Sequence, residues 1–157
     1  MTRTRCTALA LFACLLPSVA AAGPVLDARV DGAVTGKNAP QLGTGIGARV
    51  GLPIDVGPIT LVPEGGATFW IGDGLVVPDV GASARFGTAL QPGVYAHLLF
   101  PLPTPGGPTR GWDTGASLEL TVLPVDIGLH AGALTLSGPA QPTTTALVGG
   151  VHLGLAF

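Results

Sequence analysis

Three histidines, His97, His130 and His152, are the side chains best suited to acid–base or metal chemistry in this sequence. None of them accompanies a serine or an acid in a nucleophile motif such as G-x-S-x-G. No H-x-x-x-H pair occurs, and the three residues fall in different predicted strands, so the spacing does not indicate a zinc site. The sequence therefore predicts a non-enzymatic protein with no catalytic, metal-binding or cofactor-binding residues.

Charged residues are scarce. Of the 157 residues, 10% are charged and 47% are hydrophobic, whereas an average globular domain has about 25% charged residues. Seven Lys and Arg against nine Asp and Glu give a net charge of −2, and no basic cluster exists to neutralise phosphates, which argues against nucleic acid as a partner. The 25 glycines and 15 prolines disfavour a helical protein.

The remaining charges follow a strand period of two. In the segment 26–34 the charged residues occupy odd positions, while Leu, Ala, Val, Gly and Val occupy even ones. The same alternation predicts eight strands, at 26–34, 42–52, 59–70, 77–87, 94–100, 112–122, 125–135 and 146–157. Ten charged residues fall within or beside these strands, all on one face: Asp27, Arg29, Asp31, Arg49, Glu64, Asp79, Arg85, Asp113, Glu119 and Asp126.

The opposite strand face carries no charge and is rich in Val, Ile, Leu and Phe, so it must be buried in protein or in lipid. A soluble exported barrel or sandwich that binds an apolar ligand would turn this face inward. A transmembrane barrel would turn it toward lipid and the charges toward the lumen. A soluble β domain needs many surface charges, and the chain after residue 22 has one Lys and two Glu. We therefore expect an all-β fold, an eight-stranded antiparallel up-and-down transmembrane β-barrel.

The lumen of such a barrel is just wide enough to be filled by side chains. We expect an acid-rich ion-pair network there, in which Arg49 and Arg85 neutralise Glu64 and Asp79, lumen glycines make room and the histidines fill space. The predicted network comprises Asp27, Arg29, Asp31, Arg49, Glu64, Asp79, Arg85, Glu119 and Asp126. A narrow cation-preferring channel is the alternative, because acids outnumber arginines on this face.

The predicted connections alternate in length, as barrel topology requires. The outer loops are expected at 36–41, 71–76, 101–111 and 137–145, and the inner turns at 53–58, 88–93 and 123–124. Phe69, Trp70 and Trp112 are expected at the outer rim and Phe157 at the inner rim, where aromatic girdles belong.

The first 22 residues have the features of a secretory signal peptide. Arg3 and Arg5 precede an apolar run at 7–16, and Ala20 and Ala22 form a small-residue cleavage site. Residues 1–22 are thus predicted to be removed, together with both cysteines, and residues 23–157 to form the barrel domain.

The last seven residues alternate apolar side chains up to a terminal phenylalanine, at Val151, Leu153, Leu155 and Phe157. This ending resembles the C-terminal β-signal of outer-membrane barrel proteins. Together with the signal peptide and the eight segments, it makes residues 23–157 resemble the small eight-stranded outer-membrane barrels of the OmpA/OmpX type. The resemblance implies a Gram-negative cell outer membrane, contact with outer-membrane lipid, assembly by the barrel-assembly machinery, and a structural or surface-interaction role whose partner the sequence does not name.

Overall fold

A computed structural model describes residues 20–21, 23–35, 43–122, 124–139 and 141–157. The described chain is all-β. Within it, no helix combines the length and the apolar character needed to cross a membrane. The strands are β1 (Ala20–Ala21), β2 (Val25–Thr35), β3 (Gly43–Gly51), β4 (Ile54–Val56), β5 (Ile59–Trp70), β6 (Leu75–Phe86), β7 (Leu90–Leu99), β8 (Arg110–Val122), β9 (Val125–Gly138) and β10 (Gln141–Ala156).

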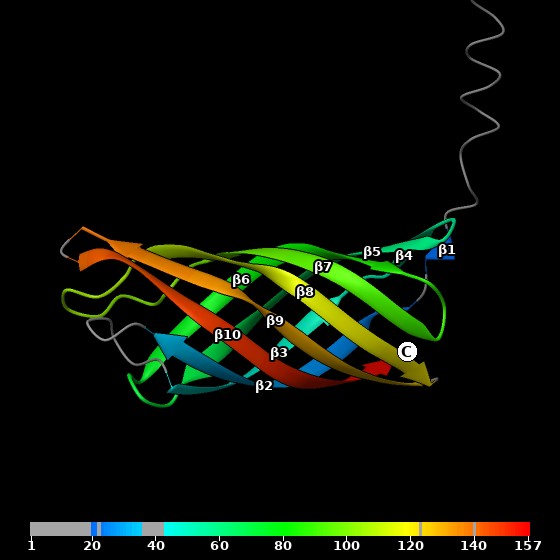
Figure 1. The fold of residues 1–157 in the computed structure, drawn as a ribbon, viewed down its shortest axis with the longest axis horizontal. Helices are drawn as coiled ribbons and strands as arrows, with labels where there is room; N and C mark the ends of the chain where they lie inside the picture. The colour runs from blue at the N-terminus through cyan, green and yellow to red at the C-terminus, as the bar shows by residue number, and fades with distance from the viewer. Residues whose placement is uncertain (1–19, 22, 36–42, 123, 140) are drawn as a thin grey trace, which may run out of the picture.

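Eight of these strands close into an antiparallel barrel (Figure 1). Their order around the wall is β2, β3, β5, β6, β7, β8, β9 and β10, and β10 pairs back onto β2. The closing ladder runs from Ala146 opposite Thr35 to Ala156 opposite Val25. A closed sheet has no unpaired edge, so no strand of the wall needs charged residues for protection. The predicted eight-stranded up-and-down topology is confirmed.

The barrel has two distinct ends. We call the end with the connections 71–74 and 100–109 the loop end, and the end with Val25 and Ala156 the terminal end. At the terminal end, β4 forms a hairpin with β5 through Gly57, whose φ of 65° favours glycine, and β1 pairs with β4.

Three predicted boundaries were wrong. The segment 53–58 contains strand β4 and is not only a turn. Strand β7 begins at Leu90, four residues before its predicted start, because Pro92 continues the ladder opposite Leu118 although Gln-Pro-Gly resembles a turn. Strand β9 continues to Gly138 and β10 resumes at Gln141, so the predicted long loop at 137–145 is a tight connection. The predicted loop at 36–41 and residues 1–19 and 22 of the predicted signal peptide lie outside the described residues.

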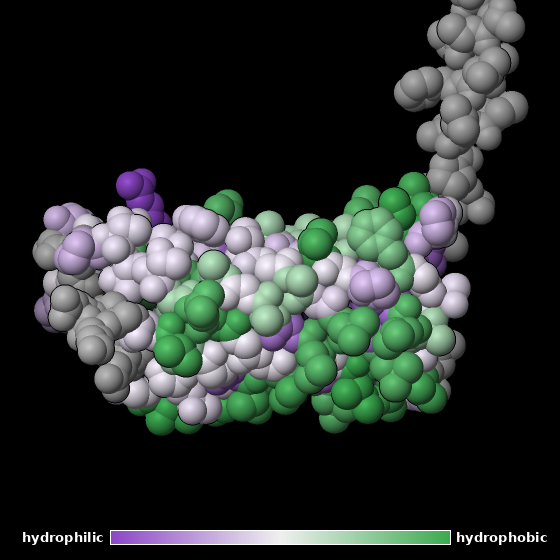
Figure 2. All heavy atoms as spheres, in the orientation of Figure 1, coloured by the Kyte–Doolittle hydropathy of each residue, from purple (hydrophilic) through white to green (hydrophobic). Residues whose placement is uncertain are grey.

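The apolar face of each barrel strand points outward, as the alternation of apolar and polar residues predicts. Val30, Ile46, Leu129 and Val151 are 48–55% exposed. Figure 2 shows green hydrophobic side chains over this wall, with pale patches of small or weakly polar residues between them. An outward apolar surface of this extent requires an apolar environment.

An apolar cluster fills the lumen at the loop end, which the sequence analysis did not predict. It comprises Trp70, Leu75, Val77, Leu99, Leu134, Leu136, Ala146 and Val148, and we call it the plug. Trp70 is only 2% exposed, so its predicted place in a rim girdle is wrong: it follows Phe69 directly, and successive strand residues point to opposite faces. Phe69 and Trp112 do face outward.

Candidate functional site

The polar part of the lumen holds three arginines, each paired with a carboxylate from the wall. Arg29 Nε lies 2.7 Å from Asp31 Oδ2. Arg49 Nε lies 2.9 Å from Asp79 Oδ1, one of the two acids that Arg49 and Arg85 were expected to neutralise. Arg85 pairs with Glu119 and not with Glu64.

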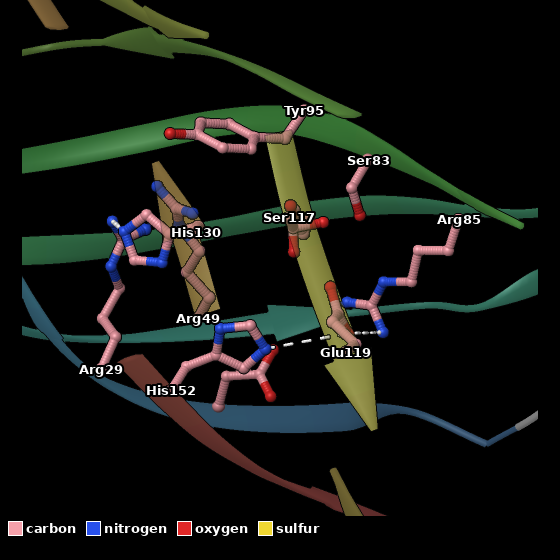
Figure 3. A pocket seen from close by; sticks show the side chains of 11 residues that line it. Arg29, Arg49, Ser83, Arg85, Tyr95, Ser117, Glu119, His130 and His152 are labelled. Carbon is pink, nitrogen blue, oxygen red and sulfur yellow. Dashed lines mark hydrogen bonds and ion pairs between the residues drawn. The ribbon is translucent and has the colours of Figure 1, made fainter. Parts of the chain in front are cut away.

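The histidines belong to the same network. Glu64, which pairs with no arginine among the described residues, lies 2.8 Å from His97 Nε2. His130 Nε2 lies 3.0 Å from Asp31 Oδ1 and 3.0 Å from Arg29 Nη2. His152 Nε2 is 3.7 Å from Glu119 Oε2, within ion-pair range but too long for a hydrogen bond. Figure 3 shows His130, His152 and the arginines pointing into one space from different strands.

Strand register explains why four of these six pairs form. In each of four rows across the barrel, a glycine separates an acidic residue from a basic one two strands away. The rows are Arg49–Gly66–Asp79, Glu64–Gly81–His97, Asp31–Gly150–His130 and Glu119–Gly128–His152. A side chain on the middle strand would occupy the space in which the acidic and basic side chains meet. A Cβ on Gly81 would overlap the His97 ring, and a Cβ on Gly128 would overlap the His152 ring.

Tyr95 and Asp113 complete the network. Asp113 was predicted on the lumen face but not as a member of the network, and Tyr95 was not predicted in the lumen. The Tyr95 hydroxyl donates to Asp113 Oδ1 at 3.3 Å. The Tyr95 ring stacks on His97 with ring centroids 5.4 Å apart and meets His130 edge-on at 5.9 Å. Tyr95 shares the inward phase of β7 with His97, which is the signal that would have placed it here.

Asp27 and Asp126, both predicted members of the network, are not brought to a basic partner. They lie in one row on either side of Gly154, and neither forms an ion pair within the described part of the chain. Asp126 Oδ1 is buried without a hydrogen-bond partner. Two acids without an ion-pair partner in the described chain thus lie toward the terminal end, while a third, Asp113, lies toward the loop end.

The free space inside the network is small. One cavity of about 40 Å³ is lined by Asp27, Arg29, Arg49, Glu64, Ser83, Arg85, Tyr95, Ser117, Glu119, His130 and His152. Buried polar atoms without protein partners border it, namely Ser83 Oγ, Ser117 Oγ and Arg85 Nε. Since a water needs roughly 10–15 Å³ of such space, the cavity fits a few water molecules, whereas ligand pockets measure about 300–1,000 Å³.

Between the network and the plug, a void of about 10 Å³ borders both Arg49 and Trp70. The polar network therefore passes directly into the apolar plug. Within the described residues, no group of three or more His, Cys, Asp or Glu side chains is arranged to hold a metal ion.

Two solved structures share this architecture. One is a de novo designed transmembrane β-barrel, with a TM-score of 0.55 and 14% identity over 87% of this chain and 96% of that chain. The other is Neisserial surface protein A (NspA), with a TM-score of 0.54 and 15% identity over 88% of this chain and 99% of that chain. The chain has the fold of the small eight-stranded transmembrane β-barrels. The resemblance drawn from the sequence is thus confirmed for the barrel fold. No protein-family model and no curated protein matches the chain.

The residues predicted to form a β-signal lie on the outer surface of this barrel. Val151, Leu153 and Leu155 project from β10 and are 45–54% exposed, and Phe157 follows the strand with 74% exposure. The Phe157 amide donates to the Pro24 carbonyl at 3.1 Å, which holds the chain end against the start of β2. Recognition of these residues by the assembly machinery stays a prediction.

Proposed function

We propose that this protein is a non-enzymatic integral protein of a Gram-negative outer membrane, with a structural or surface-interaction role and a lumen that does not conduct. The observation that carries the proposal is the filled lumen. The plug closes the loop end, and the ion-pair network occupies the rest with a cavity of only about 40 Å³.

The charge distribution supports insertion in a membrane. The ten charged residues predicted to share one face all line the lumen, while the outer wall carries large apolar side chains such as Val30 and Leu129. A soluble lipocalin-like barrel would have the reverse arrangement. A predicted signal peptide at 1–22 and a predicted β-signal at the C-terminus are the features needed for export and for assembly by the barrel-assembly machinery.

The plug argues against the cation channel that the acid excess suggested. A conducting path must pass Trp70, Leu134 and Val148, which are 2–4% exposed and pack together. An ion that entered this apolar segment would lose its hydration with no polar group to replace it. Four of the seven acids in the lumen instead pair with its arginines and histidines.

The loop end offers a surface for interaction. A cavity of about 240 Å³ opens there between the turn 71–74 and the loop 100–109. It is lined by Asp73, Leu75, Thr104, Pro105, Gly107, Pro108, Leu136, Ser137, Pro142 and Thr144. Leu75 and Leu136 belong also to the plug, so the rigid barrel directly supports the surface that a partner would meet.

Two measurements test the proposal. Fractionation of cells should recover the protein in the outer membrane, and the detergent-extracted protein should migrate differently in gels before and after boiling. Purified protein that floats with lipid vesicles should produce no conductance steps in a planar bilayer, while a porin inserted in parallel does. Recovery as a soluble periplasmic protein would refute membrane insertion, and cation-selective steps lost in Glu119→Gln would establish the channel instead.

A further inference from the structure

Arg110 is the one charged residue of the eight barrel strands that faces outward. It is the first residue of β8, at the loop end, and shares the outward phase with Trp112 and Thr114. It takes part in no ion pair within the described part of the chain. An outward arginine costs about 2–4 kcal/mol at the bilayer midplane but only about 0–1 kcal/mol near an interface, so Arg110 belongs at the level of the lipid headgroups.

Arg110 lines a shallow cavity at the loop end. It has a volume of about 370 Å³ and is lined by Thr109, Arg110, Ser137, Gly138, Pro139 and Thr143. Ser137 is the register partner of Arg110 on β9, and the Thr109 amide donates to the Ser137 carbonyl at 2.9 Å, which holds the two strand ends together. The lining offers a guanidinium and three hydroxyls but no carboxylate, which suits a phosphate.

An apolar groove lies on the same wall, on the membrane side of Arg110. It has a volume of about 570 Å³ and is lined by Val80, Gly81, Ala96, His97, Leu98, Trp112 and Thr114. One row across β6, β7 and β8 consists of the large residues Val80, Leu98 and Trp112. The next outward-facing row, farther from the loop end, contains the small residues Ala96 and Thr114. A row of large side chains beside a row of small ones produces the groove. Trp112 is the next outward residue after Arg110, about 7 Å along the strand.

We propose that these two cavities form one site for a phosphorylated lipid of the surrounding leaflet. The phosphate binds Arg110 and the hydroxyls beside it, and one acyl chain lies in the groove against Trp112. The order along β8, from cation to interfacial tryptophan to apolar groove, is the order of phosphate, backbone and acyl chain in such a lipid. This inference rests on the proposed membrane insertion, because the wall must face lipid.

Trp112 provides the test. The chain has two tryptophans, so Trp70→Phe leaves Trp112 as the only tryptophan, which can be excited selectively at wavelengths that tyrosine does not absorb. This variant is refolded into phosphatidylcholine vesicles that contain a small fraction of either brominated phosphatidic acid or brominated diacylglycerol with the same chains. Bromine quenches tryptophan only at close range. We expect brominated phosphatidic acid to quench Trp112 at a lower mole fraction than brominated diacylglycerol. Arg110→Gln should weaken this preference about fivefold, because one basic residue at an anionic surface contributes roughly 1 kcal/mol.

A matched control reports on the opposite wall. In the background Trp70→Phe and Trp112→Phe, the substitution Phe69→Trp places the tryptophan at the loop end of β5, on an outward strand face that carries no charged residue. It should show no preference between the two lipids, and Arg110→Lys should retain most of the preference at Trp112. Equal quenching of Trp112 by both lipids, or a preference unchanged in Arg110→Gln, would overturn the site.

Protection of Trp112 from both lipids as the protein-to-lipid ratio rises would instead assign the groove to a second copy of the chain. The assay needs only a folded barrel in a vesicle. A conducting lumen would therefore refute the proposed function and leave this result intact, whereas protein that fails to float with vesicles refutes membrane insertion itself.

Discussion

The Arg49–Asp79 pair provides a direct test of the glycine rows. Asp79 has a side chain only 1% exposed, Arg49 is 11% exposed, and the two meet across Gly66 with 2.9 Å between Nε and Oδ1. At an effective dielectric constant of about 20, two charges about 4 Å apart attract by about 4 kcal/mol. Desolvation costs several kcal/mol per ion, so the intact pair and a neutral pair have similar energies.

The single and double variants should therefore differ in a characteristic way. Arg49→Met leaves the Asp79 carboxylate buried and unpaired, and Asp79→Asn leaves the guanidinium unpaired; each should lower the free energy of unfolding by about 3–5 kcal/mol. The double variant strands neither charge and should be more stable than either single variant.

Urea unfolding of the barrel in lipid vesicles, followed by tryptophan fluorescence and by the gel shift between folded and unfolded forms, measures all four proteins. Arg110→Gln is the control for loss of an arginine that faces outward, and it should change the free energy of unfolding by at most about 0.5 kcal/mol. If the decrease in the free energy of unfolding of the double variant equals the sum of the two single decreases, Arg49 and Asp79 do not interact across Gly66.

Three further predictions follow from the same geometry. Gly150→Ala should destabilise the barrel by about 1–3 kcal/mol, because the added Cβ would overlap Asp31 and His130. Gly149→Ala should be tolerated, because the nearest atom to its Cβ would be 3.4 Å away. Equal urea midpoints for the two variants would contradict this prediction. Leu129→Arg, well inside β9 on the outward face, should cost about 2–4 kcal/mol in the same titration, and Leu120→Arg, two residues from the end of β8, should cost less; the reverse order would show that the barrel sits differently in the bilayer. Deletion of Phe157 should lower assembled protein in cells far more than it lowers stability after refolding, where one exposed side chain is lost, and normal outer-membrane levels would show that the ending is not read as a β-signal.

The alternation of residue types predicted the barrel wall well, because a strand has a period of two and the wall separates two environments. Every charge from Asp27 to Asp126 that was assigned to the lumen face lies inward. The outward positions were found for the same reason. The prediction needed only the phase of each strand, which a single charged residue such as Arg49 is enough to set.

Partners inside the lumen were harder to predict, because they depend on register between strands that are not neighbours. Arg85 was expected to serve Glu64 or Asp79, but its partner is Glu119 on β8. The plug was missed for a related reason. The plug includes Leu75, Val77 and Leu136, which point into the lumen near strand ends. The predicted strands end or begin close to these residues, so the sequence did not indicate that they lie at the same height in the barrel. Gly45 makes room for a residue of the plug, because a Cβ there would lie 2.9 Å from Thr68 and 3.1 Å from the Trp70 ring.

The glycines, which argued against helices and were expected to make room in the lumen, have a more specific role in the barrel. The lumen is narrow, so side chains from every strand cannot all be long. Placing a glycine between an acid and a base lets the two reach each other through the space that a middle side chain would occupy. Four such rows bring Arg49 and the three histidines to carboxylates, while Arg29 and Arg85 pair with Asp31 and Glu119 outside the rows. At the loop end the rows give way to large apolar side chains, so the same narrow lumen is filled by Trp70 and its neighbours and not by charges. The interior thus changes from polar to apolar along the barrel axis. This change supports the proposal that the barrel is a closed scaffold and not a channel.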